Sequence, residues 1–555
     1  YDSGKYIPSE NADKVNNAAE LTGKLFDSLD RYVLEDYDAK PTFSNFLPGV
    51  AGLYGKPMWT FYVNRGQGFA SFGVDSKDYP ILEFNPANKA YISTAQRGFR
   101  TFIKATRDGE TETIEPFSPA TARSLQDNLD DESLPKRFMF VGTNEMEILE
   151  TDEKTGLETN VIYFLMPKED FAAVVRRTKI TNTGDTPVTI DVLDGLPKIE
   201  PAGGGLDFML KNMGRTLEGW MGVYHADEKE KTMPFYRLST QPSDSASVKI
   251  QEAGHYVLAY TDDKPNDLLP IVYDSSKVFG RDTTLSNPWG FENVKSVDDI
   301  VNGKQYGAAT TSSAFVAISK KTLAPGESVT INSFYGKASK ISEVSTIARI
   351  VRGEGWVDKK LQEARSTMDD ITAAVTTTTG NHLFNGAIKQ MYMDNGLRGG
   401  LPVILGDVND ELKLLNSDED ERVKVFHVFS RIHGDLERDY NSFHLKPAYF
   451  SQGPGNYRDV AQNRRNDVIL SPRVAGFDIK MFLSYVQADG YEPLTVEAIA
   501  FYLKDKEKCR YIAETATGNT TNVMSSTNQL HDILCGGTFR PGQLFELIEQ
   551  LGVNV

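Results

Sequence analysis

The first 340 residues alternate apolar and polar side chains in short runs separated by turn residues, and this pattern most limits the fold. A period of two is typical of strands that bury one face. Paired runs of this kind flank Gly184-Asp185 and Pro325-Gly326, whose backbones suit hairpin turns. Many such runs predict a large antiparallel β-sandwich. The hairpins expected within it are 173–180 with 188–193 and 314–318 with 328–334.

The Gly-rich stretch 56–73 also alternates strongly. It lacks the glycine and lysine spacing of a phosphate-binding loop, so we interpret it as two adjacent strands. Asn64 and Arg65 lie between these strands and are alternative candidates for a pocket shared with the rest of the chain.

Helical spacing replaces the strand pattern from residue 341. Apolar residues then recur at intervals of three and four, and Gly353 and Gly355 separate two expected helices. Four threonines at 376–379 and Gly380 mark a further boundary. Beyond it, helices are expected over 383–394, 421–432, 478–486, 496–503 and 542–551. The expected domains are a β-sandwich (1–340), a helical linker (341–380) and a helical domain (381–555).

Charge and cysteine content exclude several classes of protein. The chain of 555 residues carries 60 basic and 77 acidic side chains, a net charge of -17 that disfavours nucleic acid as a main partner. Its two cysteines cannot form a disulfide framework or a closed zinc site alone, which fits a reducing cytoplasm. No apolar run approaches the roughly 18–20 residues that span a bilayer. We therefore expect a cytoplasmic protein without membrane or nucleic-acid partners.

Polar side chains are concentrated behind a Gly453-Pro454-Gly455 loop. Arginine supplies a rigid fork of donors and aspartate accepts from paired hydroxyls, so the set suits a sugar ring. A helix start with intrahelical ion pairs fits the same residues. The candidate substrate-binding residues are Gln452, Asn456, Tyr457, Arg458, Asp459, Gln462, Arg464, Arg465 and Asp467, with His444 upstream.

Two neighbouring segments invite other hypotheses. His427, His433 and His444 lie near acids, but their spacing does not match a helical metal-binding pair, so we expect polar pocket lining and no metal site. Asp407 and Asp410 are weak candidates for a catalytic acid. The acids that follow them do not form the calcium-loop pattern, and a plain surface turn is the alternative.

Taken together, these segments resemble the inverting β-glucan phosphorylases related to cellobiose phosphorylase. The resemblance is greatest to enzymes acting on β-1,3-gluco-oligosaccharides and runs the whole length of the chain. The Tyr457-Arg458-Asp459-x-x-Gln462 motif is its most specific part. The matching segments are 41–49, 61–67, 84–91, 433–440 and 456–467.

The resemblance implies a β-sandwich, a helical linker and an (α/α)6 barrel of which 381–555 is the first part. It implies that Arg458 and Asp459 hold the glucose next to the scissile bond. The implied reaction is phosphorolysis with inversion, in which an acid protonates the glycosidic oxygen while inorganic phosphate, the co-substrate, attacks the anomeric carbon. The product would be α-glucose 1-phosphate, and no cofactor is expected. Related enzymes carry an arginine where this chain has Ser451 and Gln452.

The acid of this family lies in a Trp-Asn-Asp loop after the Arg-Asp pair, and this sequence has no such loop there. All four tryptophans precede residue 381. We expect a barrel completed by a C-terminal half, supplied as a separate chain or as further sequence, and homo-oligomerisation is a further alternative. Two other functions stay open: a non-catalytic carbohydrate-binding or scaffold protein, and a glycoside hydrolase that uses Asp407 or Asp410.

Overall fold

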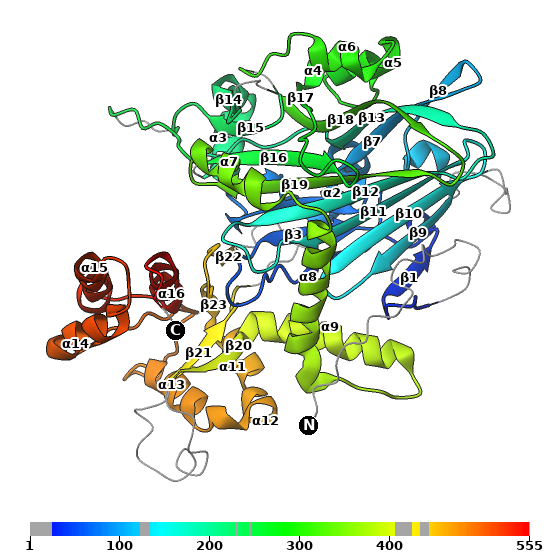
Figure 1. Ribbon diagram of the computed structural model, residues 1–555. Helices are drawn as coiled ribbons and strands as arrows, with labels where there is room; N and C mark the ends of the chain where they lie inside the picture. The colour runs from blue at the N-terminus through cyan, green and yellow to red at the C-terminus, as the bar shows by residue number, and fades with distance from the viewer. Residues whose placement is uncertain are drawn as a thin grey trace.

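A computed structural model (Figure 1) describes residues 25–122, 134–203, 205–227, 231–242, 246–309, 311–405, 424–432 and 443–553. Two large antiparallel sheets occupy the upper part of the view, and the last third of the chain lies below them. The mixed β and α architecture expected from the sequence is confirmed.

The larger sheet has nine strands, all paired antiparallel. In spatial order they are β1 (Tyr32–Glu35), β9 (Lys136–Val141), β10 (Glu145–Asp152), β11 (Leu157–Leu165), β12 (Ala173–Asn182), β19 (Ser328–Ala338), β16 (Gly254–Thr261), β15 (Pro234–Leu238) and β14 (Met221–His225).

The second sheet has five strands, also antiparallel. Their order is β17 (Ile271–Asp274), β18 (Ser312–Leu323), β13 (Val188–Leu196), β7 (Arg100–Arg107) and β8 (Glu110–Ile114). One hydrophobic core joins both sheets, because it includes Val161 and Val174 from the larger sheet together with Ile190 and Val316 from the smaller one.

Both hairpins expected from the sequence are wrong. β12 pairs with β11 and β19, while β13 pairs with β18 and β7, so the chain crosses from one sheet to the other after Asn182. β18 and β19 are divided between the sheets in the same way. The turn at Pro325-Gly326 is confirmed, and Gly326 has the positive φ of 77° that such a turn requires. A turn fixes the reversal of the chain, but the partner of each strand depends on distant residues.

A buried ion pair crosses the core between the two sheets. Arg176 in β12 contacts Asp194 in β13 at 2.7 Å, and neither side chain is exposed. Thr101 donates to the same carboxylate at 2.7 Å, and Thr178 donates to its other oxygen at 2.9 Å. The guanidinium also donates to Gln67 at 2.6 Å. This network of hydrogen bonds and the ion pair therefore hold β12 and β13 of the two sheets in contact.

A four-stranded sheet extends the β-rich part toward the remainder of the chain. Its central strands, β3 and β4, are paired as the sequence predicted. Asn64 is buried and binds the backbone of Tyr37, Pro41 and Phe43, so it fixes a loop and does not line a pocket. The order of the strands is β2 (Ser44–Leu47), β3 (Trp59–Val63), β4 (Phe69–Gly73) and β6 (Pro80–Leu82).

Short helices accompany the sheets. They are α2 (Ala87–Arg97), α3 (Leu206–Met213), α4 (Ser275–Phe279), α5 (Trp289–Asn293) and α6 (Val297–Asn302).

Two helices lead from the sheets to the rest of the chain. α7 (Ile341–Ile350) and α8 (Trp356–Thr372) are separated at Gly353 and Gly355, as expected. Val344, Ile347 and Leu361 pack into a core with residues of the larger sheet. Figure 1 shows α8 running down from that sheet toward α9 (His382–Gly399).

Two predicted helices in the last third are wrong. The stretch expected to be helical at 421–432 contains the strand β21 (Lys424–Val428), which pairs with β20 (Leu401–Leu405). Val425, Phe426 and Val428 are buried, and β-branched and aromatic residues favour strands. The predicted helix at 496–503 is absent: residue 496 ends the short strand β24 (Thr495–Val496), and 497–503 form an irregular segment.

Three predicted helices in this part of the chain are confirmed: 383–394 lies in α9, 478–486 matches α13 (Phe477–Tyr485), and 542–551 matches α16 (Pro541–Gln550). The remaining elements are β22 (His444–Leu445), which pairs with β5 (Asp75–Ser76), β23 (Gly455–Asn456), α11 (Tyr457–Arg464), α12 (Asp467–Leu470), α14 (Lys506–Thr517) and α15 (Val523–Cys535). Closure of helices into a barrel stays a prediction.

The two cysteines form a disulfide, Cys509–Cys535, between α14 and α15. The cysteine content therefore no longer supports a reducing compartment, because the two cysteines are paired. A cytoplasmic location stays a prediction. Among the described residues, no helix combines the length and apolarity needed to cross a membrane.

Removing the charge of Asp194 should destabilise the protein strongly. Asp194→Asn leaves the Arg176 guanidinium buried without its counter-charge, at an expected cost of about 3–5 kcal/mol. Asp358→Asn is the control, because it removes a partly exposed ion pair with Arg177, and should cost less than about 1 kcal/mol. Urea unfolding measures both. Equal stability of the two variants would contradict a structural role for the cross-sheet pair.

Buried His255 should make the protein sensitive to mild acid. Burial lowers the pKa of His255 to about 3, from 6.5. Below pH 6.5 the unfolded chain takes up a proton that the folded protein excludes, so stability falls by about 1.4 kcal/mol per pH unit until pH 3. His255→Gln should show a shallower loss of melting temperature between pH 7.5 and 5. His531→Gln, at a more exposed position, should keep the wild-type slope, and identical slopes for all three proteins would refute the assignment.

Candidate functional site

A tight loop places the start of α11. The Gly453 N–H donates to the carbonyl of Ser430 at 2.8 Å, and a Cβ at Gly453 would lie 2.1 Å from the carbonyl oxygen of His444. β23 then pairs with β24, and α11 begins at Tyr457. Gln452 is buried here, where its side chain donates to the His427 carbonyl and accepts from the Ile499 N–H. Gln452 thus supports the loop, which explains its polarity without a ligand.

The Arg-Asp pair lies on the first turn of α11, at the surface. The Arg458 side chain is 85% exposed and contacts Asp459 at 3.2 Å, while the Asp459 side chain is 17% exposed. Asn456 donates to the other carboxylate oxygen at 3.4 Å. A carboxylate in the first turn is favoured by the helix dipole. These three predicted residues are therefore brought together within reach of a ligand from solution.

Tyr457 and Arg464 face the other way, into the protein. The Tyr457 hydroxyl donates to the carbonyl of Phe482 at 3.0 Å, which fastens α11 to α13. Arg464 is buried, and its Nε donates to the carbonyl of Gly399 at 2.7 Å. Gln462 and Arg465 are exposed, away from this interior group.

His444 lies elsewhere, beside the β-rich part. Its Nε2 is 2.6 Å from Asp75 in β5, the strand with which β22 pairs. Asp407, Asp410 and His433 lie outside the described residues.

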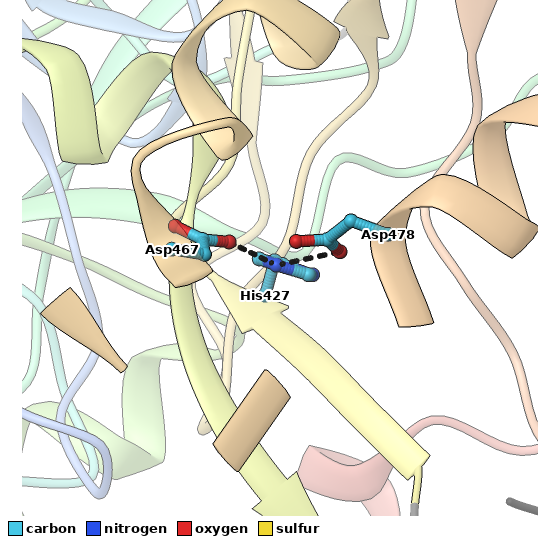
Figure 2. Close-up of side chains that lie close together, drawn as sticks. All are labelled: His427, Asp467 and Asp478. Carbon is cyan, nitrogen blue, oxygen red and sulfur yellow. Dashed lines mark hydrogen bonds and ion pairs between the residues drawn. The ribbon is translucent and has the colours of Figure 1, made fainter. Parts of the chain in front are cut away.

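A second group of polar residues lies close together near α11; some of its members were candidates from the sequence and one was not. Figure 2 shows His427 from β21 between Asp467, at the start of α12, and Asp478, in the first turn of α13. His427 Nε2 is 2.8 Å from an oxygen of Asp467 and 3.4 Å from an oxygen of Asp478. All three residues are buried. The sequence had paired His427 with other histidines and had not singled out Asp478.

Burial governs the charge of this cluster. It raises the pKa of Asp467 to about 8, with a further contribution from the neighbouring Asp478 carboxylate. Burial also raises the pKa of Asp478, against the attraction of Arg464. The pKa of His427 falls well below its usual value, first through burial and then through Arg464. Near neutral pH the imidazole is therefore neutral, and the carboxyl pair retains a proton.

A pocket of about 470 Å³ opens beside the cluster, within the size range of small-molecule sites. It lies where the β-rich part meets α8, α9, β20 and α12. Asp467 is in its wall, so the cluster and the pocket are continuous. The aromatic, charged and amide side chains that line it are Tyr54, Tyr392, Phe429, Lys168, Asp370, Asp467, Asn395, Asn463 and Asn466.

Comparison with known proteins gives no family for this chain. No protein-family model matches it, and no curated protein does. Solved structures with partial likeness include a polysaccharide lyase (10% identity, TM-score 0.28, 56% of this chain and 34% of the lyase). A bacterial glucoamylase complexed with acarbose has 9% identity and a TM-score of 0.36, over 88% of this chain and 59% of that enzyme.

A family GH92 α-mannosidase from Bacteroides thetaiotaomicron has 10% identity and a TM-score of 0.23, over 70% of this chain and 43% of the mannosidase. The chain thus spans 34% of the lyase and 59% of the glucoamylase. Likenesses this weak decide neither fold nor activity, so the function must be argued from the site.

The loop before α11 should not tolerate a side chain at residue 453. Gly453→Ala places a methyl group against the His444 carbonyl, and overpacking of this kind costs about 1–3 kcal/mol. Gly476→Ala is the matched control, because no atom lies within 4 Å of its added Cβ. Thermal unfolding should show a lower midpoint for Gly453→Ala alone. A normal midpoint would mean that the loop can relax.

Proposed function

We propose that this protein takes part in the phosphorolysis of β-linked, specifically β-1,3-linked, gluco-oligosaccharides to α-glucose 1-phosphate. The observation that carries the proposal is the Tyr457-Arg458-Asp459-x-x-Gln462 motif with its Arg-Asp pair at the surface of α11. Arg458 offers donors and Asp459 offers acceptors within one turn of helix. Adjacent hydroxyls of a glucose ring can be bound by that combination.

In the proposed mechanism, different residues bind the sugar and donate the proton. Arg458 and Asp459 hold the ring, and Asn456 and Gln462 add polar contacts from the same stretch of chain. Inorganic phosphate is already a nucleophile, so the reaction needs one acid and no second carboxylate to activate water. In this proposal the acid comes from residues that complete the helical part, supplied by a separate partner chain or by further sequence.

Exposed apolar side chains support the proposal that another protein surface packs against the helical part. Ile469 on α12 is 73% exposed, and Ile479 and Leu483 on α13 are 64% and 67% exposed. Leu494, which follows α13, is 88% exposed. Side chains of this size gather at surfaces that bind other protein. They lie in the same segment as the proposed sugar-binding motif.

The test of sugar binding is calorimetry with laminari-oligosaccharides. Asp459→Asn removes a charged acceptor, so its affinity should fall by about tenfold or more, since hydrogen bonds to charged groups contribute about 1.5–3 kcal/mol. Asp532→Asn is the control, because the Asp532 side chain is 82% exposed and lies on α15. Unchanged affinity in Asp459→Asn, or no binding by the wild type, would refute the assignment.

The products identify the reaction. Glucose 1-phosphate that appears only when phosphate is present, in a mixture with the partner chain, is the expected result. Release of free glucose without phosphate would instead identify a glycoside hydrolase. Tight binding with neither product would identify a carbohydrate-binding protein.

A further inference from the structure

Three buried side chains from distant positions converge on one point in the interior. The imidazole Nε2 of His427 and one carboxylate oxygen each from Asp467 and Asp478 lie within 4.8 Å of one another. Figure 2 shows both carboxylates directed at the imidazole from separate helices. The three residues are held by β21, α12 and α13, so rigid elements fix the arrangement.

Hydrogen bonds to the rest of the described protein leave part of this group unsatisfied. Asp478 is 7% exposed and lies against the Asp467 carboxyl, with which it shares the retained proton. Among the described residues, no other side chain or backbone group donates a hydrogen bond of good geometry to its carboxylate oxygens. A buried carboxylate is costly unless it is paired or coordinates a metal. Its oxygens face Nε2 of His427 and the carboxylate of Asp467. These atoms are the ones that metal ions take as ligands.

We propose that His427, Asp467 and Asp478 bind a divalent transition-metal ion, with Zn²⁺ as the best match. A neutral imidazole nitrogen and two carboxylate oxygens make a three-ligand set, which zinc accepts with a fourth position open. Imidazole ligation favours zinc over Mg²⁺ and Ca²⁺, which prefer oxygen. Asp467 also lies in the wall of the 470 Å³ pocket, so the proposed metal site borders that pocket.

The positive charge of Arg464 limits the affinity of this site for a metal ion. Its charge acts on both carboxylates, so the net charge available to a cation is less than that of two aspartates. Its Nε is engaged by the carbonyl of Gly399, and one terminal nitrogen lies 3.7 Å from the sulfur of Met481. The guanidinium therefore balances part of the charge from beside the cluster. The site does not depend on phosphorolysis and extends beyond the sugar-binding proposal.

The experiment titrates the full chain, dialysed against EDTA, with Zn²⁺ and separately with Co²⁺ and Mg²⁺. The expected results are one saturable zinc site, a rise in melting temperature with zinc, and a visible Co²⁺ absorption band of a low-coordinate site. Magnesium should bind far more weakly. Absence of saturable zinc binding by the wild type would overturn the proposal.

Matched variants locate the ion. Asp478→Asn keeps the shape of the side chain and should weaken zinc binding by at least about tenfold, since even indirect changes to metal ligands cost 10–100-fold. His531→Ala, which removes a surface histidine, should bind like the wild type. Asp467→Asn provides a second test if Asp478→Asn does not fold. Wild-type zinc affinity in either folded aspartate variant would place the ion elsewhere and overturn the assignment.

Discussion

The ion pair between Arg176 and Asp194 is the constraint on which the β-rich part depends. It lies wholly inside the protein and joins strands of opposite sheets. Loss of either charge would leave the other buried without a counter-charge, in an interior that solvates it poorly. Separation of the two sheets would therefore also break this ion pair. Rigid sheets in turn give α8 and the loop at residues 52–54 fixed positions, and both contribute to the pocket wall.

A second buried arginine connects this rigid base to the candidate site. Arg431 follows β21, and its guanidinium lies 4.4 Å from the ring of Trp59 in β3 and donates to the carbonyl of Pro48. Burial lowers the pKa of Arg431 to about 9, so it remains charged near neutral pH. Through this contact the strand that carries His427 is held against the four-stranded sheet. The pocket is therefore a product of both parts of the chain.

Local patterns in the sequence predicted local structure and little more. Helices such as α8 and α16 follow from apolar spacing, and the Pro325-Gly326 turn follows from backbone preference. The pairing of β3 with β4 followed from the sequence, but the partners of β12 and β13 did not. β12 and β13 are close in sequence, yet they lie in different sheets, and each pairs with a strand that comes more than 100 residues later, β19 and β18 respectively. The convergence of His427 and Asp478 has the same origin. No spacing rule links residues 51 positions apart in sequence, and only tertiary packing makes them neighbours.

The order of strands in the larger sheet has a consequence for synthesis. β12 ends at Asn182, yet its neighbour β19 begins only at Ser328, after β13 to β18 have been made. While the chain leaves the ribosome, one edge of β12 therefore stays unpaired, exposed to non-native partners. Pairing across such a separation also forms slowly. From this topology we expect that fragments ending before residue 338 lack the strand that completes the larger sheet.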